Sequence, residues 1–308
     1  MVQLYCYHFI NCDNYCSYVH CYKQCTWFVQ YRRLIMKKLI VVADWAHDSL
    51  NCQEVRTAVE GYLKDDGGAK ISFVASTPST IHTGFLLKQL TLIEERYGDP
   101  NRTVIFQNTD PRVQTQEGVE AAKGAEFILL RLYSGIWICG PNAGYDFSFL
   151  RNQIERIYHY PGLDKGSQFR SRDLYSRVSA HLMDEMEDEL ELVESSTNII
   201  PGIQDYYVGH IDNHGNIKTT ITRENLKGKF ELGEMVLITL NEVSKKAKYV
   251  SNLFGATPGE LVIYPGSSGA KDNAYMEISV WRHFTEKDPT TGVHAFNHPR
   301  PGQKIEIK

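Results

Sequence analysis

The sequence predicts two successive folded parts, a mostly parallel α/β sandwich and then a small antiparallel β-barrel. Up to residue 200, apolar runs of strand length alternate with helical patterns. From Tyr206 onward, short strand patterns follow one another without a helix-length periodic segment. The chain has 308 residues, of which 42% are hydrophobic, and this is enough for two cores.

The N-terminal segment does not share this pattern, because residues 1–35 show neither helical nor strand periodicity. Met36 with its two following lysines then leads directly into an apolar run, which is typical of a natural protein start. We therefore expect residues 1–35 to be a non-native or disordered extension. The apolar run is too short for a signal peptide and ends in Asp44.

Cysteine usage is uneven, since only Cys52 and Cys139 lie outside this extension. The other five are Cys6, Cys12, Cys16, Cys21 and Cys25. With His8 and His20 they suggest a zinc cluster as an alternative, but the spacing fits no zinc framework well, and we expect no metal. The body of the chain is typical of a reduced, cytoplasmic protein.

The first part begins with a predicted strand at residues 39–43 and a helix at 53–63. The same alternation continues with a strand at 71–74, a helix at 85–97 and a strand at 103–106. Such alternation implies a mostly parallel sheet with helices on both faces. Ligand groups in these sheets lie just past the carboxyl ends of the strands, and Asp44 and Asp110 both follow a predicted strand.

The rest of the first part is less regular. Residues 127–132 and 137–139 predict a hairpin-like pair, closed by Gly-Pro-Asn-Ala-Gly at 140–144. A helix is predicted at 173–183, and we interpret the acidic run at 184–194 as the solvated face of a helix. The polar stretch at 195–202 ends in Pro-Gly and places the domain boundary between residues 200 and 201.

The second part contains a clear β-hairpin signal around Asn-His-Gly at 213–215. Asp212 and Asn216 lie on opposite sides of this turn. They have two interpretations: residues that a tight turn needs for its backbone, or a carboxylate and an amide that hold a small polar ligand. Strands are predicted at 206–212, 217–222, 235–240, 261–264, 275–280 and 304–307.

The net charge of −4 argues against nucleic acid or an anionic membrane as a partner, because it implies no basic face. No apolar run is long enough to span a membrane.

Several motifs occur in a defined order along the two parts. They are Asp44-Trp45 with Asp48, Thr109-Asp110-Pro111, Gly140-Pro141 to Gly144, Phe169-Arg170-Ser171-Arg172-Asp173, Ser179 to Leu182, Asp212 to Asn216, and Gly266-Ser267-Ser268-Gly269 before Met276-Glu277-Ile278. In order and spacing they resemble the S-adenosyl-L-methionine hydroxide adenosyltransferases, the family that also contains the fluorinase and the chlorinase. The resemblance covers roughly residues 36 to 308.

The resemblance implies a displacement at the 5′ carbon of S-adenosyl-L-methionine, in which water attacks and adenosine and L-methionine are formed. The sulfonium is a good leaving group, so the substrate itself suffices and no further cofactor is implied. The resemblance also implies a homotrimer, with each site between the first domain of one subunit and the second domain of the next.

The resemblance assigns binding roles to individual residues. Asp44 resembles the carboxylate that binds the ribose hydroxyls, although from sequence alone it is equally well explained as a helix N-cap. Asp212 resembles the ligand of the methionine ammonium, and Asn216 resembles a residue of the purine pocket. Ser267 matches a methionine-binding serine, or else it caps backbone as a turn residue. Trp45 and Ser268 are expected to bind substrate beside them.

The catalytic residues depart from the family pattern. Asp110 matches the aspartate of an Asp–Arg–His set, but Arg170 stands where the histidine is expected. The arginine is replaced by Glu117 or Glu126, depending on where an insertion is placed, and Lys123 is the only cation between residues 113 and 130. Arginine stays protonated and cannot serve as a base, so slow hydrolysis is predicted.

Two alternatives follow from these departures. The first is a protein that binds S-adenosyl-L-methionine or adenosine without turning it over. The second is a halogenase, which rests only on Ser171, because the fluorinase has a halide-binding serine at this position. The predicted catalytic set is therefore Asp110, Arg170 and Ser171.

Overall fold

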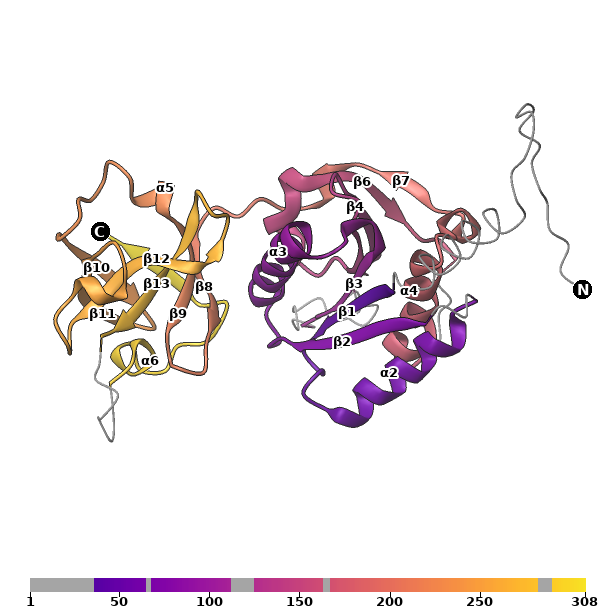
Figure 1. Cartoon of the computed structure of the whole chain (residues 1–308), viewed down its shortest axis with the longest axis horizontal. Coiled ribbons are helices and arrows are strands. Elements are labelled where there is room, and N and C mark those ends of the chain that lie inside the picture. The colour runs from indigo at the N-terminus through magenta and orange to yellow at the C-terminus, as the bar shows by residue number, and fades with distance from the viewer. Residues whose placement is uncertain (1–35, 65–67, 112–124, 163–166, 282–289) are drawn as a thin grey trace, which may run out of the picture. The chain divides into compact units, whose positions relative to one another are not determined.

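The computed structural model describes residues 36–64, 68–111, 125–162, 167–281 and 290–308 (Figure 1). Every helix and strand described below lies within residues 37–308. The predicted extension at residues 1–35, with its five cysteines, lies outside the described residues. That prediction therefore remains untested.

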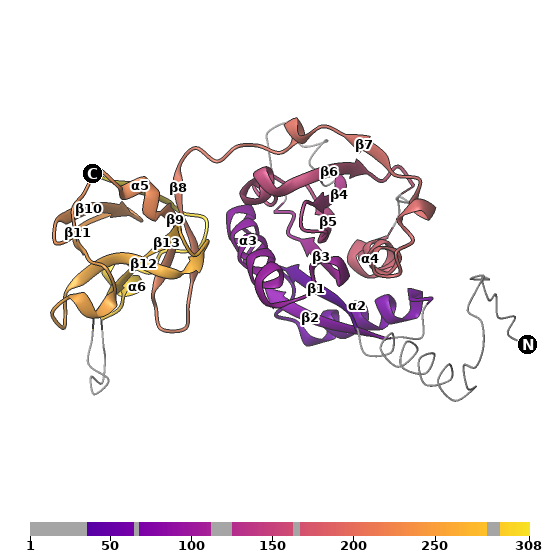
Figure 2. The ribbon, with the colours of Figure 1, turned by 45° about the horizontal axis from the view of Figure 1, so that its top comes forward.

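The first part contains a seven-stranded sheet with the strand order β2-β1-β3-β5-β4-β6-β7 (Figure 2). The pairs β1–β2, β1–β3 and β3–β5 are parallel, and the pairs β4–β5, β4–β6 and β6–β7 are antiparallel. The predicted α/β class is confirmed. The strands are β1 (Lys37–Ala43), β2 (Ala69–Ala75), β3 (Thr103–Asn108), β4 (Phe127–Leu132), β5 (Trp137–Pro141), β6 (Ile154–His159) and β7 (Val193–Ser195).

Three helices of at least two turns belong to the described residues of this part, α2 (Ser49–Tyr62), α3 (Thr80–Tyr97) and α4 (Ser176–Met183). Figure 1 shows α2 and α4 on one face of the sheet and α3 on the other. A π-helical turn, η4 (Ser171–Tyr175), leads into α4. The 3₁₀ turns are η1 (Pro100–Arg102), η3 (Ser148–Gln153), η5 (Glu187–Leu190) and η6 (Thr197–Ile199).

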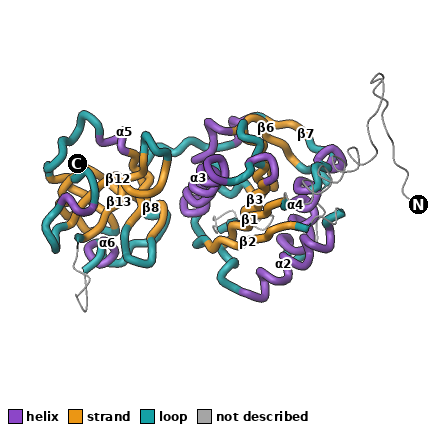
Figure 3. The backbone as a smooth tube through the Cα atoms, in the orientation of Figure 1, coloured by secondary structure: helices purple, strands orange, loops and turns teal. Residues whose placement is uncertain are grey.

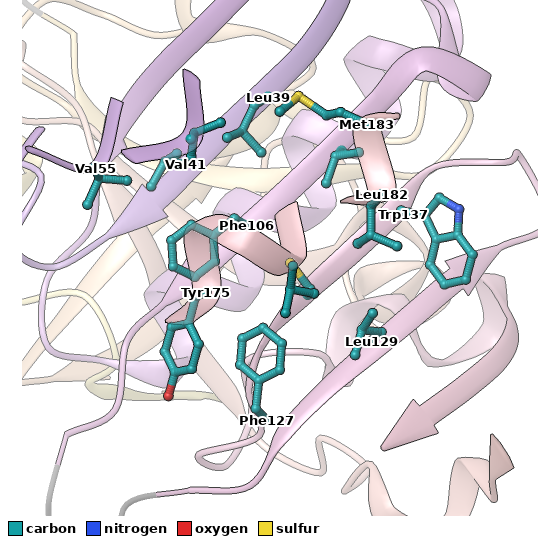
Figure 4. Close-up of a cluster of buried hydrophobic side chains, with 14 of the residues drawn as sticks. Leu39, Val41, Val55, Phe106, Phe127, Leu129, Trp137, Tyr175, Leu182 and Met183 are labelled. Carbon is teal, nitrogen blue, oxygen red and sulfur yellow. The ribbon is translucent and has the colours of Figure 1, made fainter. Parts of the chain in front are cut away.

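Strand β1 explains why the first apolar run is continuous. Its residues Leu39 and Val41 belong to the hydrophobic cluster on the α2 and α4 face, whereas Ile40 and Val42 belong to the cluster on the α3 face. A strand covered on both faces alternates between two cores and so has no polar side. Figure 4 shows the first cluster, in which Leu39 and Val41 lie together with Phe106 and Tyr175.

The interpretation of residues 184–194 as a helix face is wrong. Helix α4 ends before this run, and Glu185 and Glu191 adopt positive φ angles of 57° and 50°, which an α-helix does not contain. The Asp184 carboxylate is buried and pairs with Lys37 Nζ at 2.6 Å. The run therefore forms turn η5 and strand β7, and its first carboxylate ties the end of α4 to the start of β1.

The second part is a closed barrel with the strand order β10-β11-β12-β13-β9-β8-β14, and the predicted barrel is confirmed. Figure 3 shows that strands and loops dominate this part. Its described residues contain the short helices α5 (Arg223–Leu226) and α6 (Gly292–Ala295) and the 3₁₀ turn η7 (Leu253–Gly255). The strands are β8 (Tyr206–Ile211), β9 (Ile217–Thr222), β10 (Met235–Leu240), β11 (Val243–Tyr249), β12 (Leu261–Gly269), β13 (Ala274–Val280) and β14 (Lys304–Ile307).

One barrel strand was not predicted and one pairing is not antiparallel. Strand β11 carries exposed lysines and buries only Ala247 and Tyr249, so its sequence lacks a strand pattern. It pairs with β12 in parallel through Lys248 and Tyr249. The barrel is thus antiparallel except at this pair.

The connection between the two sheets runs from the end of β7 at Ser195 to the start of β8 at Tyr206. The predicted domain boundary after residue 200 lies in this connection and remains a prediction. Among the helices described, none combines the length and the hydropathy that a membrane crossing requires.

Candidate functional site

A cleft of about 370 Å³ opens at the edge of the first sheet where β1, β3 and β5 end, which we call the carboxyl edge. Strand β1 lies between β2 and β3, so the chain reverses its direction of travel across the sheet between β1 and β3. This is the position at which open α/β sheets usually bind ligands. Five of the lining residues were predicted as site residues: Asp44, Trp45, Asp110, Arg170 and Ser171.

Asp44 is not the N-cap of the following helix. Asp48 has that role, because its Oδ1 accepts hydrogen bonds from the backbone N–H groups of Leu50 at 2.8 Å and Asn51 at 3.1 Å. The capping alternative for Asp44 is therefore wrong. Burial raises the pKa of Asp44, and the negative charge of Asp110 adds to the increase. The charge of Asp110 thus acts on the Asp44 carboxyl group across the cleft.

Trp45 forms an aromatic wall of the cleft. Its ring packs edge-on against Phe169, with 5.8 Å between ring centroids, and lies 6.3 Å from the ring of Phe73. Trp45 Nε1 is buried and has no hydrogen-bond partner among the described residues. An aromatic wall with a spare N–H donor suits a flat heteroaromatic ligand with acceptor nitrogens.

Asp110 follows a rigidly held end of β3. Thr109 is fully buried, and its hydroxyl lies 2.7 Å from Thr83 Oγ1 and 3.0 Å from Ser76 Oγ. Asp110 Oδ2 accepts a hydrogen bond from the backbone N–H of Ala125 at 3.0 Å. Its carboxylate is therefore fixed in place with acceptor capacity left over.

The turn before α4 supplies Arg170 and Ser171. Ser171 is only 1% exposed, its hydroxyl accepts a hydrogen bond from Asn108 Nδ2, and its carbonyl accepts one from Ser176 Oγ at 2.7 Å. The serine hydroxyl is therefore engaged with the protein. Arg170 brings a permanent positive charge to a cleft that also contains the carboxylates of Asp44 and Asp110.

Further lining residues were not predicted as site residues: Asn108, Ser167, Gln168, Phe169 and Tyr175. None of the described residues that line the cleft is a histidine. Of the candidates for the missing family arginine, Glu117 and the cation Lys123 lie outside the described residues. Glu126 does not line the cleft, because its carboxylate lies 2.7 Å from His159 Nδ1.

A buried carboxyl group near the cleft was missed altogether. Asp146 is fully buried, its Oδ2 accepts a hydrogen bond from the Ala143 N–H at 3.2 Å, and its Oδ1 has no partner among the described residues. Burial raises the pKa of Asp146 to about 8, and the charges of Asp110 and Asp44 act in the same direction. The Gly-rich turn at 140–144 could have pointed to Asp146, whose carboxylate accepts the Ala143 N–H, but in the sequence the turn was considered without this aspartate.

The hairpin turn of the barrel has the geometry that its turn residues predict. Asp212 Oδ1 accepts the N–H groups of His214 at 2.9 Å and Asn216 at 3.0 Å, and Oδ2 accepts Asn216 Nδ2 at 3.0 Å. Gly215 has a φ of 75°, which glycine adopts without strain. Asp212 and Asn216 therefore build the turn, and any ligand would bind to a turn that is already formed.

Ser267 lies beside a buried ion pair. Lys218 Nζ is 2.6 Å from Glu277 Oε1 and donates to Ser267 Oγ at 3.0 Å, and the N–H of Ser267 donates to Glu277 Oε1 at 3.0 Å. The contacts of the Ser267 hydroxyl are thus with side chains and do not cap backbone. Ser268 is buried, with 5% exposure.

The predicted site residues therefore form two groups within one chain. Five line the cleft, whereas Asp212, Asn216, Ser267 and Ser268 belong to the barrel and do not line it. Among the described residues, no group of three or more His, Cys, Asp or Glu side chains is placed to hold a metal ion.

Comparison with known proteins finds solved structures with a similar fold. No protein-family model matches the sequence, and no curated protein matches it either. Among solved structures, an uncharacterized conserved protein from Thermotoga maritima is similar with a TM-score of 0.64 and 17% identity, covering 88% of this chain and 100% of that chain. A conserved hypothetical protein from Thermus thermophilus gives a TM-score of 0.55 and 14% identity, covering 89% of this chain and 100% of that chain. At these identities the likeness shows a shared fold.

Proposed function

We propose that the cleft binds S-adenosyl-L-methionine and that the protein hydrolyses it slowly to adenosine and L-methionine. The observation that carries this proposal is the meeting of Asp44, Asp110 and Trp45 in one cleft at the carboxyl edge. Carboxylates accept hydrogen bonds from the two hydroxyls of a ribose and attract a sulfonium cation, and Trp45 offers a surface for the purine. The resemblance in motif order supports the same substrate.

The reaction follows from the chemistry of the sulfonium group. A water oxygen forms a bond to the 5′ carbon while the bond from that carbon to sulfur breaks, and its electron pair leaves with L-methionine. The water must also lose a proton. The Asp110 carboxylate is the proposed acceptor, since Arg170 stays protonated. A carboxylate is a weak base, and lack of a well-matched base costs about 10² to 10⁴ in rate.

The barrel residues enter the proposal through a second copy of the chain. Asp212, Asn216, Ser267 and Ser268 do not line the cleft within one chain, so they contribute to it only if another subunit presents them. We propose the homotrimer that the family resemblance implies. In that assembly Asp212 would hold the methionine ammonium and Ser267 the rest of the amino acid.

A second candidate is a protein that binds the same ligand without turnover. It is favoured by the lack of a histidine among the described residues that line the cleft. A halogenase has less support, because the hydroxyl of Ser171 is buried and already accepts a hydrogen bond from Asn108.

The test is incubation of the purified full chain with S-adenosyl-L-methionine in water enriched in oxygen-18. We expect slow release of adenosine carrying the heavy oxygen at its 5′ position, measured by chromatography and mass spectrometry. Binding in calorimetry without adenosine formation would favour the second candidate. Absence of binding by both the substrate and adenosine would reject the cleft assignment.

A further inference from the structure

A second group of reactive side chains lies farther along the carboxyl edge, outside the cleft. Glu126 directly precedes β4, His159 ends β6, and Ser195 ends β7. These three strands are neighbours in the sheet order β4-β6-β7. Residues that are far apart in sequence are thus brought together by the strand pairing.

The register places all three side chains on one face of the sheet. His159 pairs with Ile128 on β4 and with Val193 on β7. Because alternate residues share a face, Glu126 and Ser195 lie diagonally on either side of His159. Ile128 belongs to the hydrophobic cluster on the α3 face, whereas Phe169 and Tyr175 of the cleft pack with the cluster on the opposite face.

The contacts are those of a nucleophile, a base and an orienting acid. His159 Nε2 lies 2.7 Å from Ser195 Oγ, and His159 Nδ1 lies 2.7 Å from Glu126 Oε1. A serine within hydrogen-bond reach of a histidine that is oriented by a third group is the arrangement that activates hydroxyl nucleophiles. The proximity of the carboxylate to Nδ1 favours the tautomer with the proton on Nδ1, which leaves Nε2 free to accept the serine proton.

The acid is the weaker member of the group. The Glu126 side chain is 65% exposed, and its oxygen lies off the axis of the Nδ1–H bond, since Nδ1 has no well-aligned hydrogen-bond partner among the described residues. Solvent therefore weakens its interaction with the ring. A small effect is expected when Glu126 is neutralised and a large one when His159 is replaced.

Asn142 holds the two ends of the group together. Its backbone N–H donates to the carbonyl of Glu126 at 2.8 Å, and its Nδ2 donates to the carbonyl of Ile199 at 3.2 Å, in turn η6 just after Ser195. The start of β4 and the segment after β7 are thus fixed relative to each other. The spacing of Glu126, His159 and Ser195 is held by backbone hydrogen bonds as well as by the side chains.

The serine is also accessible. His159 is 26% exposed, Ser195 is partly exposed, and β7 is the last strand of the sheet order. The outward N–H groups of an edge strand have no ladder partner, and such donors can stabilise the oxyanion that forms when a carbonyl is attacked.

We propose that Ser195 is a nucleophilic serine, activated by His159 and oriented by Glu126, that accepts acyl groups from small esters at a site separate from the cleft. Ser195 Oγ bonds to the ester carbonyl carbon while its proton passes to His159 Nε2. The bond to the leaving alcohol then breaks, and that oxygen takes the proton from His159. A water oxygen then bonds to the acyl carbon while its proton passes to His159 Nε2. The bond from that carbon to Ser195 Oγ breaks, Ser195 Oγ takes the proton back, and the free acid leaves.

The first test is labelling with an alkyl fluorophosphonate, which forms a bond from serine oxygen to phosphorus as fluoride leaves. Intact-mass and peptide mass spectrometry should find one adduct on Ser195 in the full chain. Ser195→Ala should lose the adduct. Ser196→Ala is the matched control, because it removes the neighbouring exposed hydroxyl, and it should label like wild type.

The second test separates activation from structure. His159→Gln should slow labelling and p-nitrophenyl acetate hydrolysis by about 10² or more, whereas Glu126→Gln should slow them by roughly tenfold or less. If the three side chains only held β7 to β6, His159→Gln would lower the melting temperature and the wild type would not be labelled. Absence of a Ser195 adduct in the folded wild type, or equal labelling in Ser195→Ala, would overturn the proposal even if the histidine variant failed to fold.

Discussion

The cleft at the carboxyl edge and the hairpin turn of the barrel both present an aspartate just after a strand, but the two aspartates are used differently. Asp212 has both carboxylate oxygens engaged by the turn that it builds. Asp44 does not cap the helix that follows, because Asp48 does. An aspartate at a strand end is a candidate ligand group when the backbone around it is already satisfied by another residue.

The largest effect is expected from restoring a base to the cleft. Arg170→His should raise the rate of adenosine formation by about 10² or more, because a histidine there can accept the proton of the attacking water. Adenosine release is measured by chromatography under single-turnover conditions. Arg177→His, on the exposed side of α4, is the control and should change nothing. An equal rate in the wild type and Arg170→His would show that Arg170 does not limit the reaction.

The next effect distinguishes the two aspartates that follow β1. Asp44→Ala should weaken ligand binding by roughly ten- to hundredfold, the cost of losing charge-assisted hydrogen bonds, with little change in melting. Asp48→Ala should do the opposite, since loss of an N-cap costs about 1 kcal/mol of stability and no ligand contact. Calorimetry and thermal melts on both variants test this. If only Asp48→Ala weakened ligand binding, Asp48 and not Asp44 would be the ligand-binding carboxylate.

Asp146 should give the cleft region an unusual pH dependence. Its raised pKa means that the folded protein retains a proton that the unfolded chain releases, so its contribution to stability falls as the pH rises from about 4 to about 8. Asp146→Asn should flatten that part of the stability curve. Urea denaturation at a series of pH values measures the change. Asp205→Asn, at an exposed ion pair with Lys304, should leave the slope intact.

The last effect concerns the turn of the barrel. Asp212→Ala should lower stability by about 1 to 3 kcal/mol, because three donors that it now satisfies lose their acceptor. Those donors are the backbone N–H groups of His214 and Asn216 and the side-chain amide of Asn216. Melting of Asp212→Ala and Asp205→Ala side by side provides the measurement. Equal melting temperatures would show that the turn does not depend on the carboxylate.

The sequence predicted those parts of the fold that local pattern determines. Strand β1 and the β8–β9 hairpin were found because their apolar spacing and turn residues are local signals. Strand β11 was missed because its outward lysines hide its period, although its hairpin partner β10 directly precedes it. The acidic run at 184–194 was misread for a different reason, since the partner of Asp184 is Lys37, 147 residues away.

The site divides in the same way. Asp44 and Asp110 were predicted because they directly follow strands, so their position is a consequence of topology. Asp146 was not predicted, because its burial depends on how its loop packs against α3. The packing is close at Gly84 of α3, where an added Cβ would lie 3.0 Å from the Asp146 carbonyl oxygen. The meeting of Glu126, His159 and Ser195 requires a register that no local pattern reveals.

Strand β1 has a consequence for how the first part unfolds. Its side chains alternate between the two hydrophobic clusters, and its backbone pairs with β2 and β3. Removing β1 from the sheet therefore exposes residues of both clusters to solvent. The two layers of helices are thereby coupled through a single segment of backbone. Amide hydrogens of Leu39 to Ala43 should exchange with solvent only through global opening, and more slowly than those of the edge strand β7.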